Sequence, residues 1–81
     1  MLMSHHVETK LIAKHGVGKD QVLDACLVGR YISAREDFDA ERGVRLLIRG
    51  LDRTGRQLLV LLKPVEPAEG IYRCITARIV E

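Results

Sequence analysis

The stretch GVRLLIRGLDRTGRQLLVLL, residues 43–62, decides the fold of this chain of 81 residues. Within it, residues 44–49 alternate between aliphatic side chains on one face and two arginines with a leucine on the other, which predicts a half-buried strand. The sequence Asp-Arg-Thr-Gly at 52–55 is typical of a turn whose glycine takes a left-handed conformation, so a hairpin is expected. Residues 58–62 are apolar on both faces, as in a central strand.

Two short helices are predicted before this hairpin. Apolar side chains recur at helical spacing within residues 5–15, and Gly16 offers the left-handed stop that commonly ends a helix. A second helix is expected to begin near Gly18 and to end at Gly29. Its buried stripe is predicted to consist of Val22, Leu23, Cys26 and Leu27.

The segments on either side of the hairpin give weaker signals. Residues 30–33 suit a short strand, whereas the acidic run 36–41 is predicted to be a loop. The connection at 64–70 contains two prolines and a glycine, and residues 71–80 form the last predicted strand.

The order of these elements predicts a single α+β domain over residues 1–81. Two N-terminal helices are expected to pack on one face of an antiparallel meander sheet of three to four strands. The other face of the sheet then stays open. Because the central strand presents apolar side chains there, a substrate or a partner chain is expected to cover it.

Charge is distributed unevenly along the chain, although the net charge is only +2. Residues 36–41 carry four acidic side chains and no basic one, while residues 42–63 carry six basic side chains against Asp52 alone. A basic stripe on a sheet is typical of proteins that bind a phosphate-bearing or acidic partner. The alternative is a solvated surface that the acidic run beside it partly neutralises.

Cys26 and Cys74 are the only cysteines, which is few for a small secreted domain. The N-terminus lacks the basic and apolar regions of a secretory signal, and no segment is long enough for a membrane span. We therefore expect a cytoplasmic protein with two free thiols and no membrane partner, while a disulfide between the two cysteines stays open.

Three motifs carry a resemblance to a known family. They are LIAKHGV at 11–17, followed by an amphipathic helix at 20–27, then GRQLLVL at 55–61 and YRCITAR at 72–78. Together and in this order they resemble the BrnT-type toxins of the RelE-like superfamily. The resemblance implies a RelE-like fold, a cofactor-independent and metal-independent endoribonuclease that inhibits translation, and a cognate antitoxin protein as partner.

Metal-independent RNA cleavage needs cations that hold the phosphate and a group that moves protons. Arg56 and Arg78 match the motif arginines and are the candidate phosphate ligands, because the guanidinium fork fits phosphate oxygens. His15 is the candidate proton-transfer group, since an imidazole changes charge near neutral pH. Candidate RNA-binding residues are Arg45, Arg49, Arg53, Lys63, Arg73 and Thr76.

The predicted meander brings Arg56 close to Arg78, with Arg49 nearby, and gathers Arg45, Lys63 and Arg73 at the opposite end. Each candidate also has a structural alternative: an exposed arginine paired with a carboxylate, or a histidine that is only a favourable cation in the last helical turn. Adjacent histidines at positions 5 and 6 are a weak metal signal, and no metal site is predicted.

The sequence favours a toxin–antitoxin-type endoribonuclease acting on RNA. The alternative is a non-catalytic interaction protein whose open sheet face serves for homo-oligomer formation or partner binding.

Overall fold

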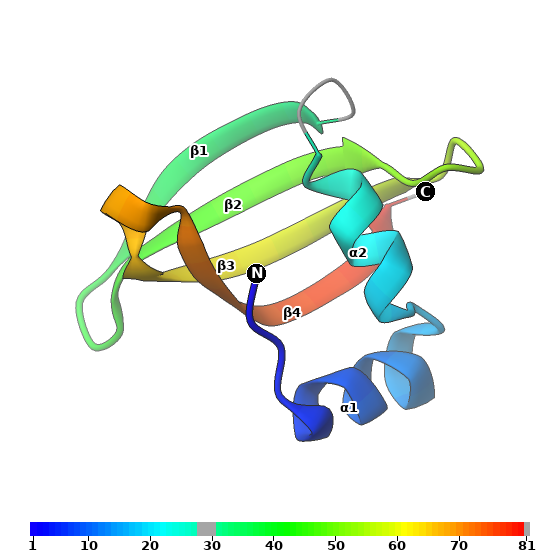
Figure 1. Ribbon diagram of the computed structural model, residues 1–81, viewed down its shortest axis with the longest axis horizontal. Coiled ribbons are helices and arrows are strands. Elements are labelled where there is room, and N and C mark those ends of the chain that lie inside the picture. Colours follow the sequence, from blue (N-terminus) through cyan, green and yellow to red (C-terminus); the bar gives the residue numbers. More distant parts are fainter. Residues whose placement is uncertain (28–30, 81) are drawn as a thin grey trace.

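A computed structural model describes residues 1–27 and 31–80 and has the predicted α+β architecture. Four strands form one antiparallel sheet in the order β1-β2-β3-β4, and the two helices precede it in the chain (Figure 1). The elements are α1 (His5–His15), α2 (Lys19–Ala25), β1 (Tyr31–Asp39), β2 (Gly43–Leu51), β3 (Gln57–Glu66), the 3₁₀ helix η1 (Pro67–Glu69) and β4 (Ile71–Val80).

Helix α1 has the predicted bounds because both of its ends are capped. The Ser4 hydroxyl accepts a hydrogen bond from the Val7 amide at 3.2 Å. At the other end Gly16 adopts φ 63° and ψ 28°, and the Val17 amide donates to the Leu11 carbonyl at 3.2 Å. Leu11 and Val17 are both buried in the core, so this end of the helix is also anchored by apolar side chains.

Helix α2 begins where the sequence predicted, but its buried face differs. Leu23 and Leu27 are 36% and 53% exposed, which shows that the predicted stripe is wrong at these two positions. Val22 is buried as predicted, and Ala25 also faces the sheet, because Gly50 on β2 lets the helix backbone approach closely. A β-carbon at Gly50 would collide with the Ala25 carbonyl group. Helix α2 ends at Ala25 with Cys26 as its C-cap, earlier than predicted, and Gly29 itself lies outside the described residues.

Strand β1 corrects the sequence-based prediction of a loop in the acidic run. Residues 36–39 continue the strand, and Asp37 stands opposite Arg45 on β2. The Arg45 Nη2 atom lies 2.9 Å from Asp37 Oδ2 and 3.8 Å from Asp39 Oδ2. Opposite charges on paired strands stabilise the pairing, and this offsets the low strand preference of aspartate. Position 30 of the predicted short strand lies outside the described residues.

The helices and the sheet enclose the core between them. Helix α2 lies over β2 and β3, while α1 lies along β4 at the edge of the sheet (Figure 1). The core consists of the buried side chains of Leu11, Val17, Val22, Ala25, Ile48, Leu58, Val60, Leu62, Cys74 and Ala77. The opposite side of the sheet carries no helix among residues 1–27 and 31–80, and we call it the open face.

The N-terminal segment extends the sheet at β4. Leu2 pairs in parallel with Arg73: its amide donates to the Tyr72 carbonyl at 2.7 Å, and its carbonyl accepts from the Cys74 amide at 2.8 Å. Met1 and Met3 pack against the core beside it. In the part of the chain that the structure describes, the helices are all too short to cross a membrane.

Candidate functional site

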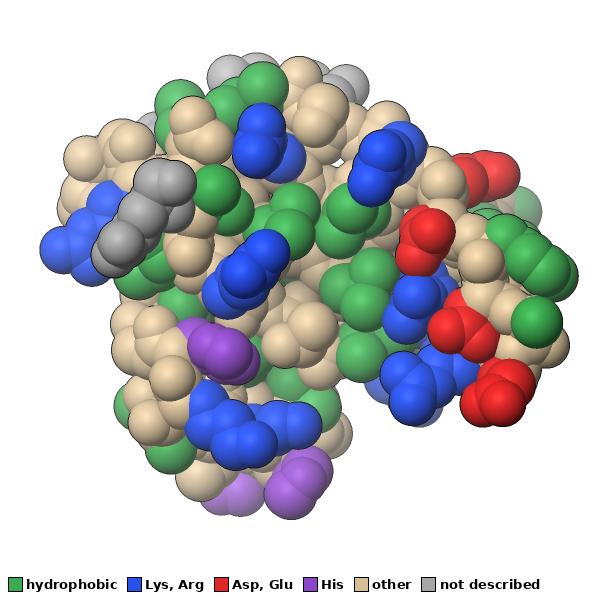
Figure 2. All heavy atoms as spheres, turned by 180° about the vertical axis from the view of Figure 1, so that it is seen from behind, with side chains coloured by type: hydrophobic (Ala, Val, Ile, Leu, Met, Phe, Trp, Pro, Cys, Tyr) green, Lys and Arg blue, Asp and Glu red, His purple; other side chains and the backbone are tan. Residues whose placement is uncertain are grey.

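The open face has an apolar centre with a basic border. Leu47 on β2 stands opposite Leu61 on β3, and Leu59 lies two residues before Leu61, so these three leucines point to the open face as an apolar floor. Figure 2 shows this side of the molecule, with apolar side chains in the middle and basic side chains around them. The exposed basic residues on this face, which we call the basic border, are Arg35, Arg49, Lys63, Arg73 and Arg78.

His15 and Arg78 meet at one edge of this face. Both line a cavity of about 170 Å³ together with Thr76 and the three leucines of the floor. His15 is the last residue of α1, and the left-handed Gly16 fixes where the helix stops beside β4. Arg78 stands opposite Leu59 and Thr76 stands opposite Leu61. The structure thus places the predicted proton-transfer group beside one of the two predicted phosphate ligands.

A second depression continues from the first across the sheet. Its volume is about 340 Å³, and it is lined by Ser33 and Arg35 on β1, Leu47 and Arg49 on β2, and Leu59 on β3. Leu47 and Leu59 line both depressions. A continuous apolar surface with cations on both sides therefore runs from His15 to β1.

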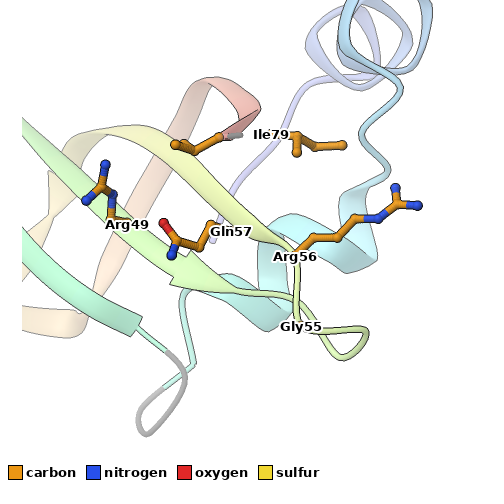
Figure 3. A pocket seen from close by; sticks show the side chains of 6 residues that line it. Arg49, Gly55, Arg56, Gln57 and Ile79 are labelled. Atoms are coloured by element: carbon orange, nitrogen blue, oxygen red, sulfur yellow. The ribbon is translucent and has the colours of Figure 1, made fainter.

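Arg56 is not brought to this surface. It lines a depression of about 710 Å³ with Gln57 and with Arg49, which also lines the second depression, and Figure 3 shows its side chain extending away from both. Arg56 lies in the β2–β3 connection directly before β3, so the alternation of the strand does not fix its direction. Arg56 does not line the cavity that contains Arg78, whereas Arg49, which the sequence placed near both, lines one depression with Arg56.

Two of the predicted RNA-binding arginines are held by carboxylates. Arg45 is paired with Asp37 and Asp39, and its side chain is only 15% exposed. Arg53 lies in the β2–β3 turn and binds both carboxylate oxygens of Asp24, at 2.8 Å and 3.1 Å. This pairing raises the pKa of Arg53. Both arginines therefore join elements of the fold, with part of their charge neutralised.

Lys63 and Arg73 gather at the far end of the floor, as the sequence predicted, and Arg45 lies on the neighbouring strand. Lys63 on β3 stands directly opposite Arg73 on β4, and both side chains are exposed. The basic border thus has two ends, with Arg78 and Arg49 at one and Lys63 and Arg73 at the other.

The sequence analysis missed a polar network beneath the β2–β3 turn. Asp52 is 1% exposed and accepts hydrogen bonds from the Thr54 hydroxyl at 2.7 Å, the Arg56 amide at 3.0 Å and Gln21 Nε2 at 3.1 Å. The Thr54 hydroxyl, followed by Gln21 and the turn amides, holds the pKa of Asp52 well below its ordinary range. The Asp-x-Thr-Gly turn signals the local bonds. The hydrogen bond from Gln21 joins α2 to the turn, and no sequence pattern near Gln21 or Asp52 indicates it.

Asp52 makes the stability of the fold sensitive to acid. Its pKa is lower in the folded chain than the ordinary 3.8 of an unfolded one, so the folded state binds fewer protons. The stabilisation is present above roughly pH 5 and is lost as the pH falls toward the lowered pKa. We expect Asp52→Asn to weaken the dependence of the unfolding free energy on pH between pH 5 and pH 2, as urea titrations would measure. Glu66→Gln, at an exposed carboxylate, is the control, and an unchanged dependence in Asp52→Asn would contradict the assignment.

The cysteines do not suit nucleophilic chemistry. Cys26 and Cys74 are both free, and burial raises the pKa of each thiol to about 11. The thiolate, which is the reactive form, is therefore scarce at neutral pH. Within residues 1–27 and 31–80, His, Cys, Asp and Glu side chains do not cluster in groups of three or more that suit a metal ion.

Comparisons of the chain with protein-family models, with curated proteins and with solved structures find no match.

Proposed function

We propose that this chain is a metal-independent endoribonuclease of the toxin–antitoxin type, with a RelE-like fold, and that it cuts RNA at the cavity between His15 and Arg78. One observation supports the proposal most directly: the guanidinium of Arg78, the imidazole of His15 and the hydroxyl of Thr76 line the same cavity beside the apolar floor. The cognate partner that the resemblance implies is an antitoxin protein.

The residues divide the chemistry between them. The ribose 2′-oxygen forms a bond to phosphorus while the bond from phosphorus to the 5′-oxygen breaks, which leaves a cyclic phosphate. Arg78 offers two parallel donors to the phosphate oxygens as their negative charge grows, and the Thr76 hydroxyl adds a third. His15 takes the proton of the 2′-hydroxyl, and the departing 5′-oxygen takes a proton from the imidazolium or from water.

The charge of the open face bears on the alternative of a non-catalytic oligomer. The five residues of the basic border form no ion pair with any other residue of the described ranges. Of the acidic side chains on this face, Asp37 and Asp39 are engaged by Arg45, and Glu66 lies at the end that carries Lys63 and Arg73. Two copies joined face to face would oppose one basic border to another, at a cost in free energy. An anionic partner fits this face better, and RNA is the anionic partner that the cavity can process.

The proposal is tested by incubating the purified chain with a labelled single-stranded RNA in the presence of EDTA. We expect cleavage to persist in the chelator and to yield fragments that end in a 2′,3′-cyclic phosphate. An RNA with one 2′-deoxynucleotide at the preferred position is the control substrate, and it should resist cleavage at that position because the nucleophile is absent. Intact RNA after long incubation, or cleavage of the deoxy substrate at the same position, would overturn the proposal.

A further inference from the structure

An irregularity in β4 places two distant arginines on the same face. Arg73 and Arg78 are five residues apart, so a regular strand would direct them to opposite sides of the sheet. However, Leu61 pairs with Thr76 while the next residue, Leu62, pairs with Cys74, which leaves Ile75 as an extra residue. This β-bulge reverses the alternation, and both arginines point to the open face.

The bulge creates a cluster of like charges at the far end of the floor. Arg73 stands directly opposite Lys63, and side chains in such positions have β-carbons about 5 Å apart. Like charges at this separation destabilise the pairing of two strands. On the open face Asp37 and Asp39 are occupied by Arg45, and Glu66, which stands opposite Ile71, forms no ion pair with Lys63 or Arg73. An anion between Lys63 and Arg73 removes this repulsion.

The distance between the two ends of the basic border defines what can bridge them. Arg78 stands opposite Leu59 and Arg73 stands opposite Lys63, four residues further along β3. At about 3.3 Å for each residue of a strand, the two ends lie about 13 Å apart. Leu61 on β3 and Leu47 on β2 fill the space between them. A single phosphate would need both arginines to lean inward over the leucines, whereas two phosphates of one polynucleotide strand, with a nucleotide between them, match the separation of the two ends.

We infer that Lys63 and Arg73 form a second phosphate-binding subsite, and that a single-stranded polynucleotide lies along β3 with phosphates at both ends and unpaired bases over the apolar floor. This inference rests on the proposed function for the identity of the bound polymer. A duplex turns its phosphates outward and keeps its bases stacked inside, so it cannot place bases on the leucines. The second subsite therefore selects single strands longer than a dinucleotide.

The test separates binding from cleavage by using a single-stranded oligonucleotide that is fully 2′-O-methylated and cannot be cut. Its affinity for the full chain is measured by fluorescence anisotropy over a range of salt concentrations. We expect the double variant Lys63→Ala/Arg73→Ala to bind about tenfold or more weakly. Its slope of log K against log salt should be smaller by about 1.4, because each phosphate contact with a single strand contributes about 0.7. The matched control is Lys19→Ala/Arg42→Ala, which removes one exposed cation on α2 and one in the β1–β2 turn, neither of them part of the basic border.

Two further measurements distinguish a binding role from a structural one. Lys63→Ala should melt at a higher temperature than the wild type in the absence of RNA, because it removes the repulsion from Arg73. A dinucleotide with one phosphodiester should be cut equally by the wild type and by the double variant, since it cannot span both ends.

The outcomes for this inference and for the proposed function differ. If the double variant binds the oligonucleotide as the wild type does, or if a duplex binds as tightly as the single strand, the second subsite is overturned while cleavage at His15 and Arg78 stands. If binding depends on Lys63 and Arg73 but RNA is not cut, the subsite is supported and the endoribonuclease proposal fails.

Discussion

Replacing His15 with alanine is expected to lower the rate of RNA cleavage by about 10²–10⁴-fold, the range typical of a lost proton-transfer group. The imidazole lines the cavity that contains Arg78 and Thr76, and no other histidine, aspartate or glutamate of the described residues lines it. The measurement is single-turnover cleavage of a labelled RNA. Binding of the non-cleavable oligonucleotide should change little, because the floor and the basic border stay in place.

His6→Ala is the matched control for this substitution. His6 is also exposed and lies on α1, near the end of the helix that is remote from Gly16. The His6→Ala variant should cleave RNA as the wild type does. Thermal melts of both variants should match that of the wild type, because the caps of α1 are untouched. Equal cleavage by His15→Ala and the wild type would remove His15 from the mechanism and leave a water molecule as the base.

Arg78→Ala is expected to lower cleavage by about 10²–10³-fold, as the loss of one preorganised donor to a developing oxyanion usually does. Arg78→Lys should restore little of the rate, since an ammonium group cannot supply two parallel hydrogen bonds to a phosphate. Arg78 is exposed, so the stability of the fold should change by no more than about 0.5 kcal/mol. Cleavage of RNA and thermal melting of both variants are the measurements.

Arg42→Ala and Arg56→Ala complete this series. Arg42 lies in the β1–β2 turn, and its replacement by alanine should leave the rate of cleavage unchanged. Arg56 matches a family motif, but its side chain extends away from Arg49 and Gln57, so we expect a smaller loss of activity than for Arg78→Ala (Figure 3). A large drop in the melting temperature of Arg78→Ala would give Arg78 a structural role instead. A loss in Arg56→Ala equal to that in Arg78→Ala would show that the cavity is assembled differently when RNA binds.

Features with local causes could be predicted from the sequence. The bounds of α1 depend on Ser4 and Gly16, which act within a few residues of the helix ends. The β2–β3 hairpin follows from the alternation of its strands and from Gly55, which adopts φ 87° in the turn. The sequence did not predict that His15 and Arg78 line one cavity, because this depends on how α1 lies along β4.

Features with distant causes were missed. The acidic run forms β1 because Arg45, on the next strand, pairs with Asp37, and strand preference alone does not include such a partner. The buried face of α2 was misplaced because Gly50, far along the chain, sets how the helix approaches the sheet. The bulge at Ile75 leaves no composition signal, although it decides which arginines share a face.

The pairing of Leu2 with Arg73 has a consequence for how the chain folds. The meander joins strands that are neighbours in sequence, so each hairpin forms by closing a short loop. Leu2 and Arg73 come from opposite ends of the chain, and their contact can form only on a β4 that is already in place. Opening of this terminal segment releases the amide of Cys74 and the carbonyl of Tyr72, on either side of Arg73. Closing of this segment therefore completes the strand end that carries Arg73, and an RNA that bound there only in the closed form would stabilise it over the frayed one.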